Sequence, residues 1–132
     1  MRPAEIFFSH ASEDRSAVEP IVAALRDRNL SVWYSRTSII GSALWHDEIG
    51  KALDRCDWFV IALSRAAVES VWVKRELIYA LSDHRYEERI TPLLLEDCEF
   101  RRLSWVLPSI EYVDFRHDRH LAQIQLLSSL GS

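Results

Sequence analysis

The feature that most constrains this chain is an apolar run at residues 57–64, Asp-Trp-Phe-Val-Ile-Ala-Leu-Ser. The run is apolar at successive positions, not at every second one, and it is too short for a typical helix. Strands of this kind are buried on both faces, as in parallel sheets that helices cover on either side. Residues 57–64 therefore predict a buried strand of a parallel sheet.

Other segments extend this pattern along the chain. Short apolar or β-prone runs predict further strands at residues 5–9, 31–34, 89–95 and 110–114. Apolar residues at helical spacing predict helices at residues 16–29, 45–53, 70–81 and 120–130. This alternation predicts an α/β, flavodoxin-like three-layer fold with a five-stranded parallel sheet in the order 2-1-3-4-5. In that order, ligands bind beyond the carboxyl ends of strands one and three.

Local signals place some boundaries more closely. Ser16 and Glu19 form a capping box, so the first helix is expected to begin at Ser16, with Pro20 in its first turn. Pro92 places the beginning of the fourth strand near an edge or a bend. The segment 35–42 is expected to be a loop, and its adjacent isoleucines are expected to pack on another surface.

Composition excludes several classes of function. With 132 residues, 48% of them hydrophobic, the chain is expected to form one domain with a sizeable core. A net charge of -4 argues against nucleic acid or an anionic membrane as the main partner. No apolar run approaches the length of a membrane span and the N-terminus lacks a signal-peptide pattern, so we expect a cytoplasmic domain. Cys56 and Cys98 have no metal-like spacing and are expected to be free thiols.

Glu76 stands out chemically in the helix expected at residues 70–81, for which Ser70 is the expected N-cap. Its neighbours one turn away are aromatic or apolar, with Trp72 and Tyr79 among them. A carboxylate without a basic neighbour on its own helix is either functional or paired with a distant group such as an arginine. From the residues alone, both interpretations stay open.

Five segments carry a resemblance that covers nearly the whole chain. They are residues 7–14 (Phe-Phe-Ser-His-Ala-Ser-Glu-Asp), 32–34 (Val-Trp-Tyr), 36–39 (Arg-Thr-Ser-Ile), 60–64 (Val-Ile-Ala-Leu-Ser) and Trp72-x-x-x-Glu76. In order and spacing, these segments resemble a Toll/interleukin receptor (TIR) domain, and the bacterial branch more than the animal receptors. We expect a single TIR domain over residues 1–132, either alone or as part of a longer protein with a separate sensing domain.

The resemblance implies an enzyme of bacterial immune signalling that cleaves NAD at the nicotinamide–ribose bond, because the tryptophan-x-x-x-glutamate step marks the NAD-cleaving members. It implies that Glu76 is catalytic, that Trp72 lines the nicotinamide pocket, and that Phe8 and Ser9 form the opposite wall. The products would be nicotinamide and ADP-ribose or a cyclic ADP-ribose isomer. NAD is the substrate, so no cofactor and no metal are expected. The substrate-binding residues implied are Phe8, Ser9, Tyr34, Arg36 and Trp72.

The resemblance also implies that the loop at residues 35–42 contacts a neighbouring protomer in active assemblies. The loop departs from many relatives at Ser35, where aspartate is frequent. It departs again at Gly41-Ser42, where a proline–glycine step is frequent. The assembly-loop residues implied are Ser35, Arg36, Thr37, Ser38, Ile39, Ile40 and Gly41.

Two other functions are available to this fold. A non-enzymatic TIR module that signals only by self-association is the main alternative, and Trp72-x-x-x-Glu76 favours the enzyme over it. A phospho-receiver needs acidic residues at the ends of strands one and three. Residues 63–65 are Leu-Ser-Arg, so the receiver is excluded.

Structural roles compete for several polar and aromatic residues. Core packing is the default for Trp72, and helix entry or turn formation suits Ser9, Ser12 and Asp14 as well as a site does. His10 and Ser9 are adjacent on a strand and face opposite ways, which argues against a nucleophile pair. A solvated turn or surface is favoured for the remaining candidates, His117, His120, Arg101 and Arg102.

Overall fold

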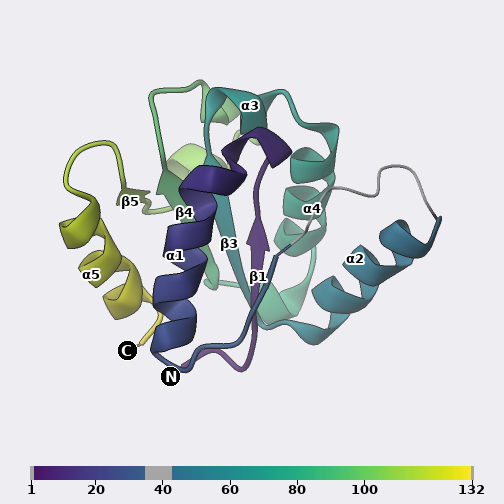
Figure 1. The fold of residues 1–132 in the computed structure, drawn as a ribbon. Coiled ribbons are helices and arrows are strands. Elements are labelled where there is room, and N and C mark those ends of the chain that lie inside the picture. The colour runs from purple at the N-terminus through teal and green to yellow at the C-terminus, as the bar shows by residue number, and fades with distance from the viewer. Residues whose placement is uncertain (1, 35–42, 132) are drawn as a thin grey trace.

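The computed structural model describes residues 2–34 and 43–131. A five-stranded sheet with parallel pairing runs through it in the order β2-β1-β3-β4-β5 (Figure 1). The strands are β1 (Ile6–Ser9), β2 (Val32–Tyr34), β3 (Trp58–Leu63), β4 (Ile90–Leu94) and β5 (Val113–Asp114). The predicted α/β fold and strand order are confirmed.

Helices cover both faces of the sheet (Figure 1). They are α1 (Arg15–Asp27), α2 (Ala43–Arg55), α3 (Arg65–Val68), α4 (Val71–Leu81) and α5 (Arg119–Ser129). Short 3-10 turns lie in the connections between strands and helices or between strands, at η1 (Ser12–Asp14), η2 (His84–Tyr86), η3 (Phe100–Arg102) and η4 (Leu107–Ser109). No helix described here is both long and apolar enough to span a membrane. The expected loop at 35–42 lies outside the described residues.

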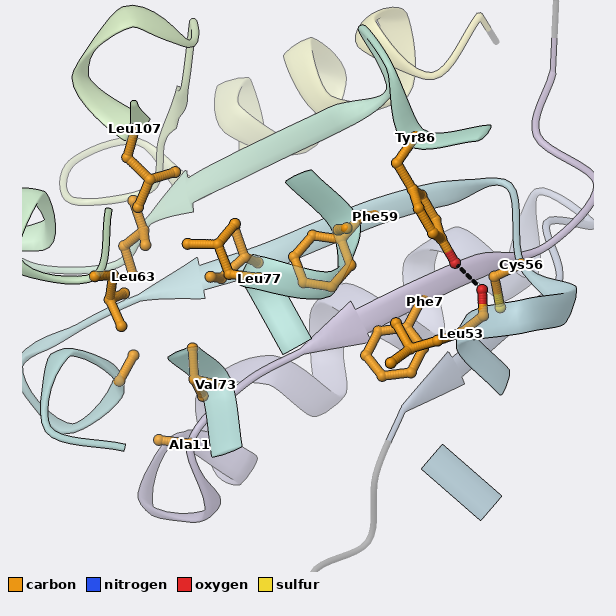
Figure 2. Packing of buried hydrophobic residues seen from close by; sticks show 14 of the residues in the cluster. Phe7, Ala11, Leu53, Cys56, Phe59, Leu63, Val73, Leu77, Tyr86 and Leu107 are labelled. Carbon is orange, nitrogen blue, oxygen red and sulfur yellow. Dashed lines mark hydrogen bonds between the residues drawn. The ribbon is translucent and has the colours of Figure 1, made fainter. Parts of the chain in front are cut away.

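Strand alternation divides the core into two clusters. Phe7 and Phe59 point to the face that α2 and α4 cover, where they pack with Leu77 (Figure 2). Phe8 and Val60 point to the other face and pack against α1 and α5. Because β3 contributes to both clusters, it is apolar at nearly every position, as its sequence predicted. Burying each such side chain stabilises the fold by about 1.5–3 kcal/mol.

The start of the first helix differs from the prediction. α1 begins at Arg15, directly after the 3-10 turn η1, so Ser16 lies inside the helix and forms no capping box. Asp14 occupies the N-cap position, yet its side chain caps no backbone N–H. It accepts a hydrogen bond from the Ser64 hydroxyl instead. A tertiary contact therefore takes the side chain that would cap the helix, and Pro20 falls in the second turn.

Pro92 lies in the middle of β4 and not at its beginning. The backbone nitrogen of Pro92 faces a side of β4 that has no strand partner at this position. The N–H of Leu95 donates to Leu63 on β3, and Leu94 accepts from Phe115 on the β5 side. Alternate residues face alternate neighbours, so the missing N–H of Pro92 faces the β5 side. β5 pairs only with Leu93 and Leu94, so no ladder bond is lost there. The fifth strand is correspondingly shorter than the predicted 110–114.

Candidate functional site

Helix α4 places Glu76 over the carboxyl end of β1. Ser70 caps the helix as predicted, since its side chain accepts a hydrogen bond from the Val73 N–H at 3.2 Å. Val73 and Leu77 are fully buried against the sheet. Glu76 lies on the same inward side and is only 6% exposed. The Glu76 carboxylate is therefore buried because it lies on the face of α4 that packs against the sheet.

One hydroxyl meets this carboxylate. The Ser9 Oγ, at the end of β1, donates a hydrogen bond of 2.6 Å to Glu76 Oε1. Burial raises the pKa of Glu76 to about 7, and the hydrogen bond from Ser9 opposes that rise. Within residues 2–34 and 43–131, no arginine, lysine or histidine forms an ion pair with Glu76. The alternative of a bridge to a distant arginine is not supported there.

Trp72 lies one turn before Glu76 and outside both core clusters. Its side chain is 36% exposed, so core packing does not describe it. Its ring lies 5.9 Å from the ring of His46 on α2, and the Arg75 guanidinium stands 5.3 Å from the indole centroid. An accessible aromatic surface thus accompanies the buried carboxylate on the same helix.

Phe8 and Tyr34 are not brought together with Glu76. They are partners in the β1–β2 register and share the face of the sheet that α1 covers. Phe8 is fully buried, and Tyr34 is half-buried with its ring 5.7 Å from that of His10. Substrate contacts by Phe8 and Tyr34 stay predictions, as does Arg36, which lies outside the described residues.

A second pair at the same edge of the sheet was missed in the sequence. The Ser64 hydroxyl, directly after β3, donates to Asp14 and accepts from the Ala67 N–H at 3.0 Å, which caps α3. Burial raises the pKa of Asp14, and the hydrogen bond from Ser64 opposes this. Ser12 is exposed and donates to its neighbour Glu13. Ser12 thus has a local contact, whereas Asp14 makes a tertiary contact and does not cap the helix that it precedes.

Other candidates carry no site. His117 and His120 are exposed, and no group of His, Cys, Asp and Glu side chains within residues 2–34 and 43–131 is arranged to hold a metal ion. Arg101 is exposed, and Arg102 pairs with Glu69 at 2.9 Å on the surface. A pocket of about 480 Å³ lies where η2 leads into β4, at the opposite edge of the sheet, and Glu76 does not line it.

The family follows from comparison with known proteins. The model of the TIR domain family matches residues 6–128. The chain belongs to the TIR domain family. The solved TIR domain of a Toll-related receptor from Hydra magnipapillata superimposes with a TM-score of 0.77 at 19% identity, covering 96% of this chain and 98% of that one. At that identity, the likeness shows the fold.

Two curated TIR relatives are more similar in sequence. A protein of Methanobrevibacter olleyae named probable 2' cyclic ADP-D-ribose synthase is 33% identical over 101 residues, which cover 72% of this chain. An NAD(+) hydrolase of an Actinoplanes species is 31% identical over 107 residues, covering 73% of this chain. The matched parts span 29% and 15% of the lengths of these two relatives. This TIR domain is thus related to one protein named as a probable 2' cyclic ADP-D-ribose synthase and to another named as an NAD(+) hydrolase.

Proposed function

We propose that this TIR domain cleaves the nicotinamide–ribose bond of NAD, with Glu76 as the catalytic residue. The observation that carries the proposal is a buried carboxylate with one hydroxyl partner and no described ion pair, at the carboxyl ends of β1 and β3. Open α/β sheets bind ligands at this edge. A buried, uncompensated carboxylate lowers stability, so its presence at this edge supports a functional role.

The chemistry needs little more than this group. Nicotinamide is already cationic in NAD, so the bond to ribose breaks with both electrons leaving on a neutral nicotinamide, and no general acid is required. The ribose that remains is oxocarbenium-like, and an ionised Glu76 stabilises its positive charge. Attack by water, with loss of a proton, gives ADP-ribose. Attack by a hydroxyl of the same molecule, with the same loss, gives a cyclic isomer.

Neighbouring parts of the domain complete the proposal. Trp72 supplies an exposed ring beside the carboxylate on which nicotinamide can stack. The loop at 35–42 joins two protomers, because the described residues around Glu76 form one wall and do not enclose a dinucleotide. The domain acts as the enzymatic part of a bacterial signalling protein. The names of the two curated relatives support the activity.

The test is nicotinamide release from NAD by the purified protein and by Glu76→Gln. Glutamine keeps the shape and the acceptor for Ser9 but removes the charge, so we expect turnover to fall about a hundredfold to a thousandfold. Glu19→Gln is the matched control, because Glu19 is exposed on α1 at the other face of the sheet. If Glu76→Gln turns over NAD as fast as Glu19→Gln, Glu76 is structural. If the unchanged protein releases no nicotinamide at any concentration, the domain acts as a scaffold for assembly.

A further inference from the structure

Ser9 is too enclosed to serve as a wall that a substrate touches. It is the last residue of β1 and its side chain is 1% exposed. Its one hydroxyl proton is already donated to Glu76 Oε1 at 2.6 Å. A serine has one donor, so this hydroxyl cannot also donate to a ribose without releasing the carboxylate. Its chemistry is therefore directed at Glu76.

The donor lies at the end of a strand that the sheet holds in place. β1 is paired on both sides, and Ser9 is in register with Ile61 of β3. Glu76, in contrast, has a long side chain whose rotamers differ little in energy. The Ser9 hydroxyl fixes Oε1, and Oε2 receives no hydrogen bond from the described residues. One carboxylate oxygen is thereby anchored while the other is left for a ligand.

Among the residues that the structure describes, no charged group shares this task with Ser9. Burial and the Ser9 hydrogen bond are the causes that shift the pKa of Glu76, and only the second favours its ionised form. The described titratable groups on the elements packed against this site are exposed, paired elsewhere or, in the case of His10, buried beside Phe8 and Tyr34. On α4, Lys74 is exposed and Arg75 lies over Trp72, which also has His46 of α2 beside it. The ion pairs on α3 and η2 are Arg65–Glu96, Glu69–Arg102 and Arg85–Asp83. Next to β1, the His10 ring faces away from Glu76, and Asp14 binds Ser64.

We infer that Ser9 is a positioning residue: its hydroxyl orients the Glu76 carboxylate and holds it in the ionised form that faces the cationic substrate. The inference rests on the proposed function and replaces the direct substrate contact expected for Ser9. A hydrogen bond to a charged, buried partner is worth enough to change a rate about tenfold to a hundredfold. Loss of the Ser9 hydroxyl changes the rate only through its effect on Glu76.

The first test is the pH dependence of kcat/KM for nicotinamide release in Ser9→Ala. Ionised Glu76 is the active form, so activity rises with pH through its pKa. Removing the group that lowers this pKa moves the midpoint upward, by about one pH unit or more. Activity at neutral pH should fall about tenfold to a hundredfold, with part of the loss recovered at high pH. Ser9→Thr keeps the hydroxyl and should return the midpoint toward that of the unchanged protein.

Ser64→Ala is the matched control. Ser64 is also 1% exposed and ends a neighbouring strand, but its hydroxyl donates to Asp14. Its loss should leave the midpoint where it is, whatever it does to the melting temperature. An equal shift in Ser9→Ala and Ser64→Ala would mean that general loosening of the strand ends, not the Ser9 hydroxyl, sets the profile, and would overturn the inference.

A second measurement does not depend on turnover. The side-chain carboxyl carbon of Glu76 can be titrated by NMR in the protein without substrate, with Glu76→Gln identifying its signal. A higher pKa of Glu76 in Ser9→Ala supports the inference even if no nicotinamide is released, an outcome that would count against the proposed function alone. An unchanged pKa overturns the inference even if the protein is an active enzyme.

Discussion

Burial raises the pKa of Glu76 to about 7, against 4.5 for the same group in water. Between these values the folded protein holds a proton that the unfolded chain has lost. The free energy of unfolding therefore falls as pH rises through this window. A shift of this size corresponds to about 3 kcal/mol at the upper end, because one pKa unit is about 1.4 kcal/mol. This direction is opposite to that of a salt-bridged surface carboxylate.

Glu76→Gln should separate this effect from the rest of the protein. We expect the variant to match the unchanged protein near pH 5 and to be more stable by about 2–3 kcal/mol near pH 8, where only the glutamate is charged. Urea unfolding at both pH values measures the difference. Glu19→Gln, at an exposed position, should show no such divergence. If the free energy of unfolding depends on pH in the same way for all three proteins, ionisation of Glu76 carries no desolvation cost.

Trp72→Ala tests the aromatic surface beside the carboxylate. If the ring stacks on nicotinamide, its removal should raise KM about tenfold and alter any ratio of cyclic to linear product. Steady-state kinetics and chromatography of the products make both measurements. Trp105→Ala is the control, because Trp105 is 80% exposed between η3 and η4 and is not next to Glu76 in sequence or register. Identical kinetics for the two variants would remove Trp72 from the site.

At the residue scale, the position of a residue along the fold could be predicted from the sequence, whereas the direction of its side chain depends on the strand register. Topology placed Ser9 and Glu76 at one edge, and the structure brings them into contact. Phe8 was expected beside Ser9, although adjacent strand residues face opposite ways. The same alternation rule, applied to Phe8 and its register partner Tyr34, would have placed both on the far face. The Asp14–Ser64 pair joins residues fifty positions apart and left no local signal.

At the scale of elements, the sequence predicted the strands and helices that have a strong hydrophobic pattern. It did not predict boundaries that depend on which of two partners a side chain binds. β3 and α4 were predicted almost to their ends, because each buries a long apolar surface. The short helix α3, Arg65–Val68, was missed, since a single turn has no period to detect. The start of α1 was misplaced because Asp14 binds Ser64 and not the helix backbone. Such choices depend on partners distant in sequence.

Two side chains of η2 donate hydrogen bonds to the end of α2. Arg85, on η2, donates to the backbone carbonyls of Leu53, Asp54 and Cys56 at the end of α2. The Tyr86 hydroxyl adds a bond of 2.5 Å to Leu53 (Figure 2). These donors satisfy carbonyls that a helix end leaves unpaired. They fix the end of α2 that is remote from residues 35–42.

Arg85→Met should therefore destabilise the domain by about 1–3 kcal/mol, the scale for leaving such carbonyls without a charged donor. Arg102→Met is the matched control, because Arg102 forms an exposed ion pair with Glu69, which is worth little. Chemical denaturation of both variants gives the comparison. Equal effects would show that the bonds to α2 add nothing beyond a surface ion pair.

At the scale of the whole molecule, the order of the strands in the sheet places the candidate site. β1 and β3 are adjacent, so their carboxyl ends, with Ser9 and Ser64, share one edge beneath α4. The described residues there supply a carboxylate, a hydroxyl and an aromatic ring. A pocket of about 480 Å³ opens at the other edge, another of about 540 Å³ lies beyond β3 and β4 between Arg65 and Arg102, and Glu76 lines neither. A dinucleotide held at Glu76 therefore needs further surface, from residues 35–42, a second protomer or both.

This need predicts that activity depends on self-association through the loop at 35–42. Turnover per protomer should rise with protein concentration. In the double variant Ile39→Asn with Ile40→Asn, turnover per protomer should stay at every concentration at the value that the unchanged protein has when dilute, because the contact between protomers is lost. Nicotinamide release and light scattering across a hundredfold dilution series make the measurement.

Leu121→Asn with Ile124→Asn is the control, since both residues are exposed aliphatics on α5, which covers the face of the sheet remote from Glu76. That pair likewise replaces two aliphatic side chains with asparagine and should leave the concentration dependence intact. Melting curves show whether each double variant is folded. Turnover that is independent of concentration, and that survives the loop change, would mean that one copy of the domain builds the whole site. The further surface around Glu76 would then have to come from residues 35–42 of the same chain.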